Sequence, residues 1–231
     1  MARKTATRQN AERNQSETWS TVKNEEKKSL IIGITGASGA LYAVHLINAL
    51  MDHVPGQTQL IMSPSGLRVC NEEMDTNLST AQDYLDWIME RRAKSDSLHS
   101  FSLEDYRDIG ARAASGSNHH DGMAIVPCSM KTLASITHGI TQNLIERAAD
   151  VTLKERRPLV VVPREAPYSL IHLRNMTSLT EAGATVVPAS PGFYQKPESL
   201  DDLGRFIASR VLSVLGIQVR LFKPWLDESP E

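Results

Sequence analysis

Cysteine is scarce in this chain of 231 residues, which holds only Cys70 and Cys128. Two cysteines without a paired spacing can build neither a disulfide framework nor a zinc site, so we expect a reducing compartment. Aromatic residues make up 5% of the chain. This low content argues against a protein that stacks the bases of single-stranded nucleic acid.

Neither sign of charge is in large excess, because the formal net charge is −2. No basic run lies on a predicted helix, so the chain lacks the footprint of a nucleic-acid-binding protein. Hydrophobic runs are also short, well below the ~18 to 20 apolar residues that a membrane-spanning helix needs. We therefore expect a cytoplasmic protein with no membrane span.

The first 28 residues are polar and lack hydrophobic periodicity. Such a segment cannot bury enough apolar surface to offset the entropy of ordering it, so we predict a disordered arm. Its arginines are typical of a mitochondrial transit peptide, but Glu12 and Glu17 argue against one. The mitochondrial matrix is therefore the lesser alternative. We predict one domain over residues 29–217 and a tail over 218–231.

From Ser29 onward, short apolar runs alternate with stretches of helical periodicity. Strands are predicted at the run that begins at Ser29 and at residues 59–62, 123–126, 159–163 and 185–187. Helices are predicted between them, including residues 80–92, 143–155, 169–182 and 200–215, while residues 94–108 give no clear pattern. This alternation predicts a three-layer α/β/α sandwich around a mostly parallel, doubly wound sheet.

The stretch LVVVPREAPYS presents Arg164 and Glu165 where a predicted strand ends. In open α/β sheets, ligands bind beyond the carboxyl ends of the strands, so this cation and carboxylate are candidates for binding and proton transfer. The alternative is a solvated surface pair of little energetic value.

Two loops offer hydrogen-bond donors to an anion. In TGASGA, Gly36 and Gly39 permit a tight turn and Ser38 lies at a helix start. In PCSMKT, the hydroxyls of Ser129 and Thr132 accompany the first backbone N–H groups of another helix, an arrangement that suits a phosphate or the edge of a flavin.

Other candidates for chemistry are weaker. Cys128 has no evident histidine partner and is expected to be a packing residue. His119 and His120 are adjacent but have no third ligand at a suitable spacing, so we assign no metal.

Cations and carboxylates recur at predicted strand ends and helix starts. Arginine and lysine together suit an organophosphate. The set comprises Glu73, Arg147, Lys154, Arg164, Glu165 and Arg210.

Several ordered motifs resemble the UbiX/Pad-type flavin prenyltransferases. They are GITGASGALYA, VPCSMKTLASI, NLIERAADVTLKERRPLVVVPREAPYS, IHLRNM and PASPGFYQKPESLDDL. The resemblance covers most of residues 29–217 but neither the arm nor residues 76–113. It implies a flavodoxin-like or Rossmann-like subunit that binds FMN at subunit interfaces in a large homo-oligomer, commonly a dodecamer.

The resemblance also implies a reaction. The dimethylallyl group of dimethylallyl phosphate is joined to N5 and C6 of reduced FMN, and phosphate is released without a metal. The product, prenylated FMN, is a cofactor of UbiD-type decarboxylases, which act in ubiquinone biosynthesis or aromatic acid decarboxylation.

Site roles follow from the resemblance, position by position. The FMN contacts that it implies are Gly36, Ala37, Ser38, Ser63, Ser129, Met130, Lys131, Thr132 and Arg164. The implied contacts to dimethylallyl phosphate are Tyr194, Arg210, Arg147, Lys154, Glu73, Ser115 and Trp225. The implied catalytic residues are Glu165 as the acid-base group, with Ser38, Glu73 and Lys154.

Alternatives remain for some of these residues. Tyr194 and Trp225 could be ordinary packing aromatics. Arg147 and Lys154 could lie on a solvated helix face, although their spacing of seven residues places both on nearly one side of a helix.

Two other functions are open at this point. One is a related flavoprotein decarboxylase that acts on a cysteine-containing substrate, although its histidine motif is not evident here. The other is a module that carries FMN without turnover. An aromatic-acid decarboxylase would fit only indirectly, through the cofactor product. The PREAP motif with Tyr194 and Arg210 favours catalysis.

Overall fold

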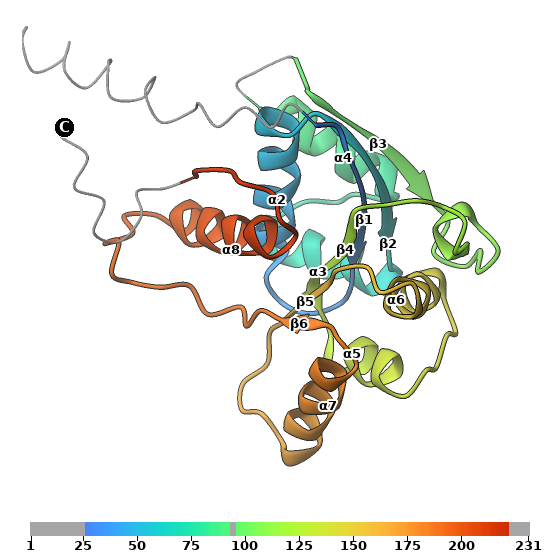
Figure 1. The fold of residues 1–231 in the computed structure, drawn as a ribbon. Coiled ribbons are helices and arrows are strands. Elements are labelled where there is room, and N and C mark those ends of the chain that lie inside the picture. The colour runs from blue at the N-terminus through green and yellow to red at the C-terminus, as the bar shows by residue number, and fades with distance from the viewer. Residues whose placement is uncertain (1–25, 93–95, 222–231) are drawn as a thin grey trace, which may run out of the picture.

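Six parallel strands form one sheet in the order β3-β2-β1-β4-β5-β6 (Figure 1). The computed structural model describes residues 26–92 and 96–221. Most of the predicted arm and the site candidate Trp225 lie outside these residues. The strands are β1 (Lys28–Ile34), β2 (Gly56–Met62), β3 (His99–Glu104), β4 (Gly122–Cys128), β5 (Leu159–Pro163) and β6 (Thr185–Val186).

Helices connect successive strands except at β3–β4, where the connection holds only one 3-10 turn, η1 (Arg112–Ala114). They are α2 (Ala40–His53), α3 (Pro64–Met74), α4 (Ala81–Glu90), α5 (Met130–Thr137), α6 (Leu144–Lys154), α7 (Leu170–Glu181) and α8 (Leu200–Val214). The predicted three-layer, doubly wound α/β sandwich is thereby confirmed. Within the described residues, no helix combines the length and apolar composition that crossing a membrane requires.

The strand β3 was not recognised from the sequence. It lies at the edge of the sheet, and only His99 of its residues is fully buried. An edge strand whose positions are mostly half-buried or exposed lacks the apolar run that marks the central strands, so its pattern was too weak to predict.

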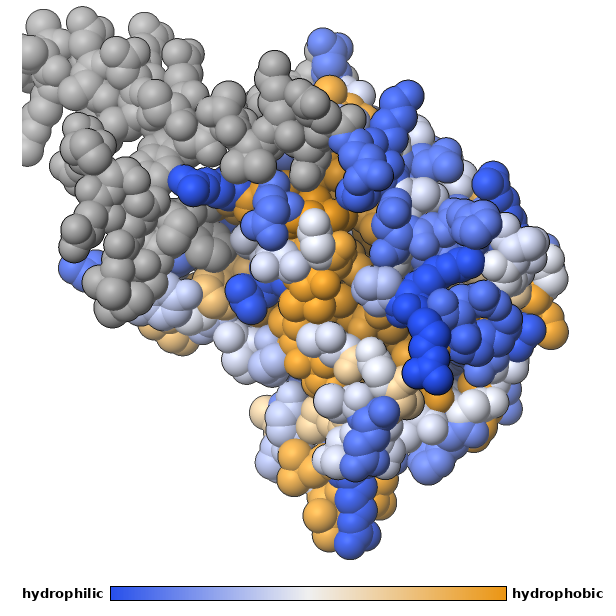
Figure 2. Space-filling view, viewed as in Figure 1, coloured by the Kyte–Doolittle hydropathy of each residue, from blue (hydrophilic) through white to orange (hydrophobic). Residues whose placement is uncertain are grey.

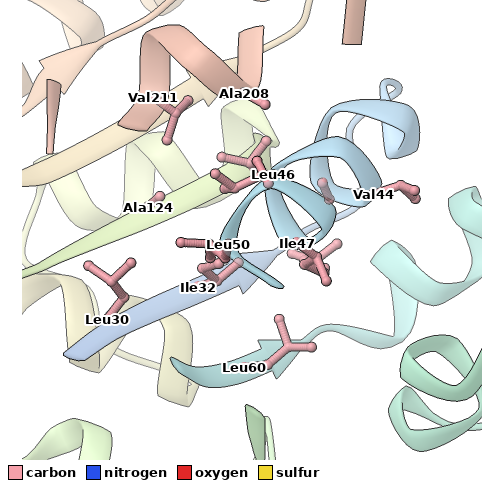
Figure 3. Close-up of a cluster of buried hydrophobic side chains, with 14 of the residues drawn as sticks. Leu30, Ile32, Val44, Leu46, Ile47, Leu50, Leu60, Ala124, Ala208 and Val211 are labelled. Atoms are coloured by element: carbon pink, nitrogen blue, oxygen red, sulfur yellow. The ribbon is translucent and has the colours of Figure 1, made fainter. Parts of the chain in front are cut away.

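The two faces of the sheet carry separate hydrophobic cores because neighbouring residues of a strand point to opposite sides. Leu30 and Ile32 of β1 pack with α2 and α8, whereas Ile31 packs with α5 and α6 on the other face. Figure 3 shows the first of these cores, with Leu50 of α2 beside Ile32. Both sides of the sheet are therefore covered, as a parallel sheet requires.

Replacement of Leu50 by alanine tests the first core. Leu50 is 0% exposed, so we expect its loss to lower the free energy of unfolding by about 2 to 5 kcal/mol through lost burial and a residual cavity. Met89→Ala is the control, because Met89 is 48% exposed on α4. Urea denaturation measures both variants; equal stability losses would contradict this account of the core.

Candidate functional site at the carboxyl edge of the sheet

The strand order reverses between β1 and β4, the two strands at the centre of the sheet. The chain leaves β1 toward α2 on one face and leaves β4 toward α5 on the other. Diverging connections leave a crevice beyond the strand ends, which is the usual ligand site of doubly wound sheets. The two loops singled out in the sequence, TGASGA and PCSMKT, both border this point.

Thr35 joins the two loops. Its hydroxyl donates to the carbonyl of Pro127 at 2.9 Å and accepts from the backbone N–H of Ser129 at 2.7 Å. Its own backbone N–H also donates to the Pro127 carbonyl at 3.2 Å. Thr35 is 3% exposed, so these bonds are shielded from water. The relative position of the loops after β1 and β4 is fixed by this one side chain.

The first loop is completed by a carboxylate that lies far away in the sequence. Gly39 precedes α2 with φ 111 and offers no side-chain cap, so the first N–H groups of the helix need another acceptor. Glu73 of α3 supplies it, accepting from the N–H of Gly39 at 2.9 Å and of Ala40 at 2.8 Å. The structure thus brings Glu73 to the first loop, where its negative charge also suits the helix dipole.

A cavity of about 450 Å³ opens where the loops meet. Its lining residues are Thr35, Gly36, Ser63, Pro64, Ser65, Tyr106, Ser129, Lys131 and Thr132. Such a volume is typical of small-molecule sites. A side chain at position 36 would place its Cβ 2.6 Å from Cβ of Ser65, so only glycine permits the first loop to approach the start of α3 this closely.

The cavity gathers five residues predicted from the sequence, namely Gly36, Ser63, Ser129, Lys131 and Thr132. Ser63 and Ser129 also act as N-caps, accepting from the N–H of Gly66 and of Thr132. The predicted residues Ala37 and Ser38 lie in the same first loop, while Met130 packs against the second core.

Two neighbours of the cavity were missed. Tyr106 follows β3, in the region without a clear pattern, and its backbone carbonyl accepts from the N–H of Leu144 at 3.0 Å. Glu146 is 0% exposed in the first turn of α6 and pairs with Lys131. Burial raises the pKa of Tyr106; the charge of Lys131 lowers it and that of Glu146 raises it. No sequence pattern marks a buried glutamate in an amphipathic helix, so only the fold reveals this pair.

Arg164 and Glu165 follow β5, as predicted. Arg164 is exposed, and Glu165 is half-buried with its carboxylate accepting from the N–H of Ala166 at 3.1 Å. Burial raises the pKa of the Tyr42 hydroxyl on α2; the charge of Glu73 raises it further and that of Arg164 lowers it. The charge of Arg164 therefore reaches Tyr42 on α2, the helix that follows the first loop.

The predicted phosphate contacts Lys154 and Ser115 lie away from this cavity in the chain. Glu146 marks the cavity end of α6, and Lys154 lies about 12 Å further along that helix at a rise of about 1.5 Å per residue. Lys154 pairs with Glu155 and adjoins Gly116, where an added Cβ would lie 2.9 Å from the Lys154 ammonium. Within a single chain, Lys154 and Ser115 therefore lie away from the loops TGASGA and PCSMKT.

The remaining predicted contacts make other interactions. Arg147 pairs with Asp150 on α6 at 2.8 Å. Tyr194 is 48% exposed and lies edge-on to Phe206 of α8, with ring centroids 6.0 Å apart. Arg210 lies exposed on α8. None of these interactions joins Arg147, Tyr194 or Arg210 to the cavity within one chain.

The cysteines and paired histidines take no visible part in the site. Cys128 is 0% exposed, and burial raises the pKa of its thiol; burial likewise raises that of Cys70 to about 11. His120 is buried with Nε2 3.4 Å from the hydroxyl of Thr152. Across residues 26–92 and 96–221, no three His, Cys, Asp or Glu side chains gather as a metal site would require.

The family model called Flavoprotein matches residues 18–212 of the chain. The flavin prenyltransferase UbiX of Halalkalibacterium halodurans is 45% identical over 198 residues, which cover 85% of this chain and 93% of that protein. This chain belongs to the UbiX-type flavin prenyltransferases. The resemblance inferred from the motifs is therefore confirmed, and a flavin prenyltransferase is an enzyme of the transferase class.

Solved structures of UbiX proteins share this fold. A dodecameric FMN-dependent UbiX-like decarboxylase from Escherichia coli O157:H7 is 41% identical with a TM-score of 0.74, and the match covers 85% of this chain and 98% of that one. AnUbiX, solved in complex with FMN and dimethylallyl pyrophosphate, is 35% identical with a TM-score of 0.72 and matches over 87% of this chain and 100% of that one.

Replacement of Thr35 by valine tests the bridge between the loops. Valine keeps the shape but leaves the N–H of the half-buried Ser129 without its acceptor, so we expect the free energy of unfolding to fall by about 1 to 3 kcal/mol. Thr177→Val is the control, because the exposed hydroxyl of Thr177 bonds only to the Leu173 carbonyl of its own helix. A Thr35→Val variant as stable in urea as this control would contradict the assigned role.

Proposed function

We propose that the chain transfers the dimethylallyl group of dimethylallyl phosphate to N5 and C6 of reduced FMN. The carbon–oxygen bond to phosphate breaks as the allylic carbon bonds to N5, which loses its proton, and inorganic phosphate leaves. The prenyl double bond then takes up a proton at one carbon while its other carbon bonds to C6, and the C6 ring proton is lost. The proposal rests on the cavity between the loops after β1 and β4, together with the FMN and dimethylallyl pyrophosphate complex of AnUbiX.

The cavity fits a flavin mononucleotide. Helices α3 and α5 begin at its wall, and both present first-turn N–H groups together with the hydroxyls of Ser63, Ser129 and Thr132. These donors suit a phosphate monoester. Gly36 keeps the first loop clear of side-chain bulk, and the cation of Arg164 follows β5. We assign the flavin contacts to these residues and to Ala37, Ser38, Met130 and Lys131.

Reduced FMN, when bound, supplies the nucleophilic positions N5 and C6. The chain supplies position and charge. Fixed cations stabilise the phosphate as it departs from the allylic carbon. Glu165 is half-buried at the end of β5, and its carboxylate is the group we assign to proton transfer during ring closure. Glu73 holds the start of α2 through the N–H groups of Gly39 and Ala40, and we assign Glu73 and Ser38 of the first loop to the catalytic group beside the reacting atoms.

We further propose that the site is complete only between copies of the chain. Lys154 and Ser115 lie away from the cavity of their own chain, so they would reach the cavity of a neighbour, together with Arg147, Tyr194 and Arg210. The helix α7 supports such assembly. Its residues Leu170, Ile171 and Leu173 are 59%, 68% and 47% exposed. Figure 2 shows hydrophobic surface at the lower end of the molecule, where Figure 1 places α7.

Prenylated FMN would pass to a UbiD-type decarboxylase, because the flavin is made here for use as a cofactor elsewhere. The cytoplasm is the proposed compartment, on the ground that both thiols are free cysteines buried in the fold.

One assay tests the transferase. The protein is incubated without oxygen with reduced FMN and dimethylallyl phosphate, and in a second arm with the pyrophosphate. Mass spectrometry should detect a flavin heavier by one prenyl group, accompanied by free phosphate in the first arm. Bound FMN without any adduct in either arm would favour a carrier of FMN and overturn the proposed reaction. Decarboxylation of a cysteine-containing peptide would instead favour the related decarboxylases.

Glu165→Gln separates binding from chemistry. The amide keeps the size of the side chain but cannot transfer a proton, so we expect prenyl transfer to slow by roughly 10²- to 10⁴-fold while FMN binding is retained. Glu198→Gln, at an exposed position before α8, is the control. Ser38→Trp should instead exclude the flavin. Turnover of Glu165→Gln at the unmodified rate would remove Glu165 from the mechanism.

A further inference from the structure

An ion pair with a buried carboxylate supports one wall of the cavity. Glu146 is 0% exposed, and its carboxylate accepts from the Lys131 ammonium and from the backbone N–H of Gln142 at 2.9 Å. The Lys131 side chain is 60% exposed and lines the cavity. The carboxylate is thus fixed inside the protein, while the lysine it pairs with lines the cavity.

The position of this pair matters because of the groups around it. Lys131 is the second residue of α5, beside the hydroxyls of Ser129 and Thr132 and the first N–H groups of that helix. These are the groups that we assign to the phosphate of FMN. The start of α2 already holds the carboxylate of Glu73. Of the two helix starts at the cavity wall, those of α3 and α5, the start of α5 carries Lys131, so we assign the phosphate to this wall.

A full positive charge at this wall would bind a phosphate dianion strongly. Glu146 neutralises part of that charge, because its carboxylate contacts the same ammonium. The proposed enzyme must release prenylated FMN after each turnover, since this product is used by another enzyme. A moderate affinity for the phosphate is therefore an advantage in a protein that makes the flavin for use by another enzyme.

We propose that Glu146 is a positioning residue that holds Lys131 at the cavity wall and limits the affinity for the flavin phosphate, so that prenylated FMN is released. This inference rests on the proposed function, because it requires FMN to be bound and its product to leave. Glu146 acts through Lys131 and is not assigned a contact with the flavin.

Glu146→Gln tests the inference. The single amide oxygen can still accept from the N–H of Gln142 but then leaves the Lys131 ammonium without its acceptor, so the charge of Lys131 is uncompensated. We expect FMN to bind on the order of tenfold tighter and to dissociate correspondingly more slowly. Riboflavin, which lacks the phosphate, should bind as it does to the unmodified protein. Flavin fluorescence titration and stopped-flow displacement measure both quantities.

Asp52→Asn is the matched control. Asp52 also pairs with a buried cation, Arg92 at 2.6 Å, but it lies in the last turn of α2, at the opposite end of that helix from the first loop. The same change of charge there should leave FMN affinity unaltered. A tightening equal to that of Glu146→Gln would show a general charge effect and overturn the inference.

Two further variants keep the test decisive. Lys131→Met should weaken FMN binding, and adding Glu146→Gln to it should not tighten FMN binding, because the ammonium through which Glu146 acts is gone. Unchanged FMN affinity in the Glu146→Gln or the Lys131→Met variant, a tightening by Glu146→Gln that persists without Lys131, or equal tightening of riboflavin would overturn the role of Glu146. Absence of prenylated flavin from the unmodified protein would instead refute the proposed function.

Discussion

The hydroxyl of Thr35 is the interaction on which the site depends. It bonds the loop after β1 to the loop after β4 at the one place where the strand order reverses. Strand pairing alone holds these two strands only up to their ends, after which the chain leaves toward opposite faces. A buried hydroxyl that both donates and accepts keeps the diverging loops at a fixed separation, and the cavity lies between them.

Three carboxylates near this cavity have different interactions and different roles. Glu73 satisfies the N–H groups at the start of α2, Glu146 holds Lys131, and Glu165 alone lies half-buried at a strand end without a cation paired to it in the described residues. A carboxylate committed to helix N–H groups or to an ammonium is poorly suited to exchange a proton. The environment of each group, more than its chemical type, separates scaffold from proposed acid-base residue.

The two ends of α6 explain why one chain carries only part of the proposed site. Its first turn supports the cavity through Glu146, whereas Lys154 lies near the last turn beside Gly116. A rigid helix cannot bring both ends to one ligand. Exposed apolar residues on α7 offer a surface through which copies could meet, so assembly and catalysis are linked in the proposal.

The sequence by itself determined the alternation of strands and helices, the positions of the loops TGASGA and PCSMKT and the Arg164–Glu165 strand end, because these depend on local periodicity and turn residues. Its motifs also led to the flavin prenyltransferase family. Only the tertiary structure decided that β3 closes the sheet edge, that Glu73 caps α2, that Glu146 supports Lys131, and that Lys154 is remote from the cavity. These contacts join residues far apart in the chain, and hydrophobic patterning specifies which face of an element is buried but not which polar group meets which across the fold.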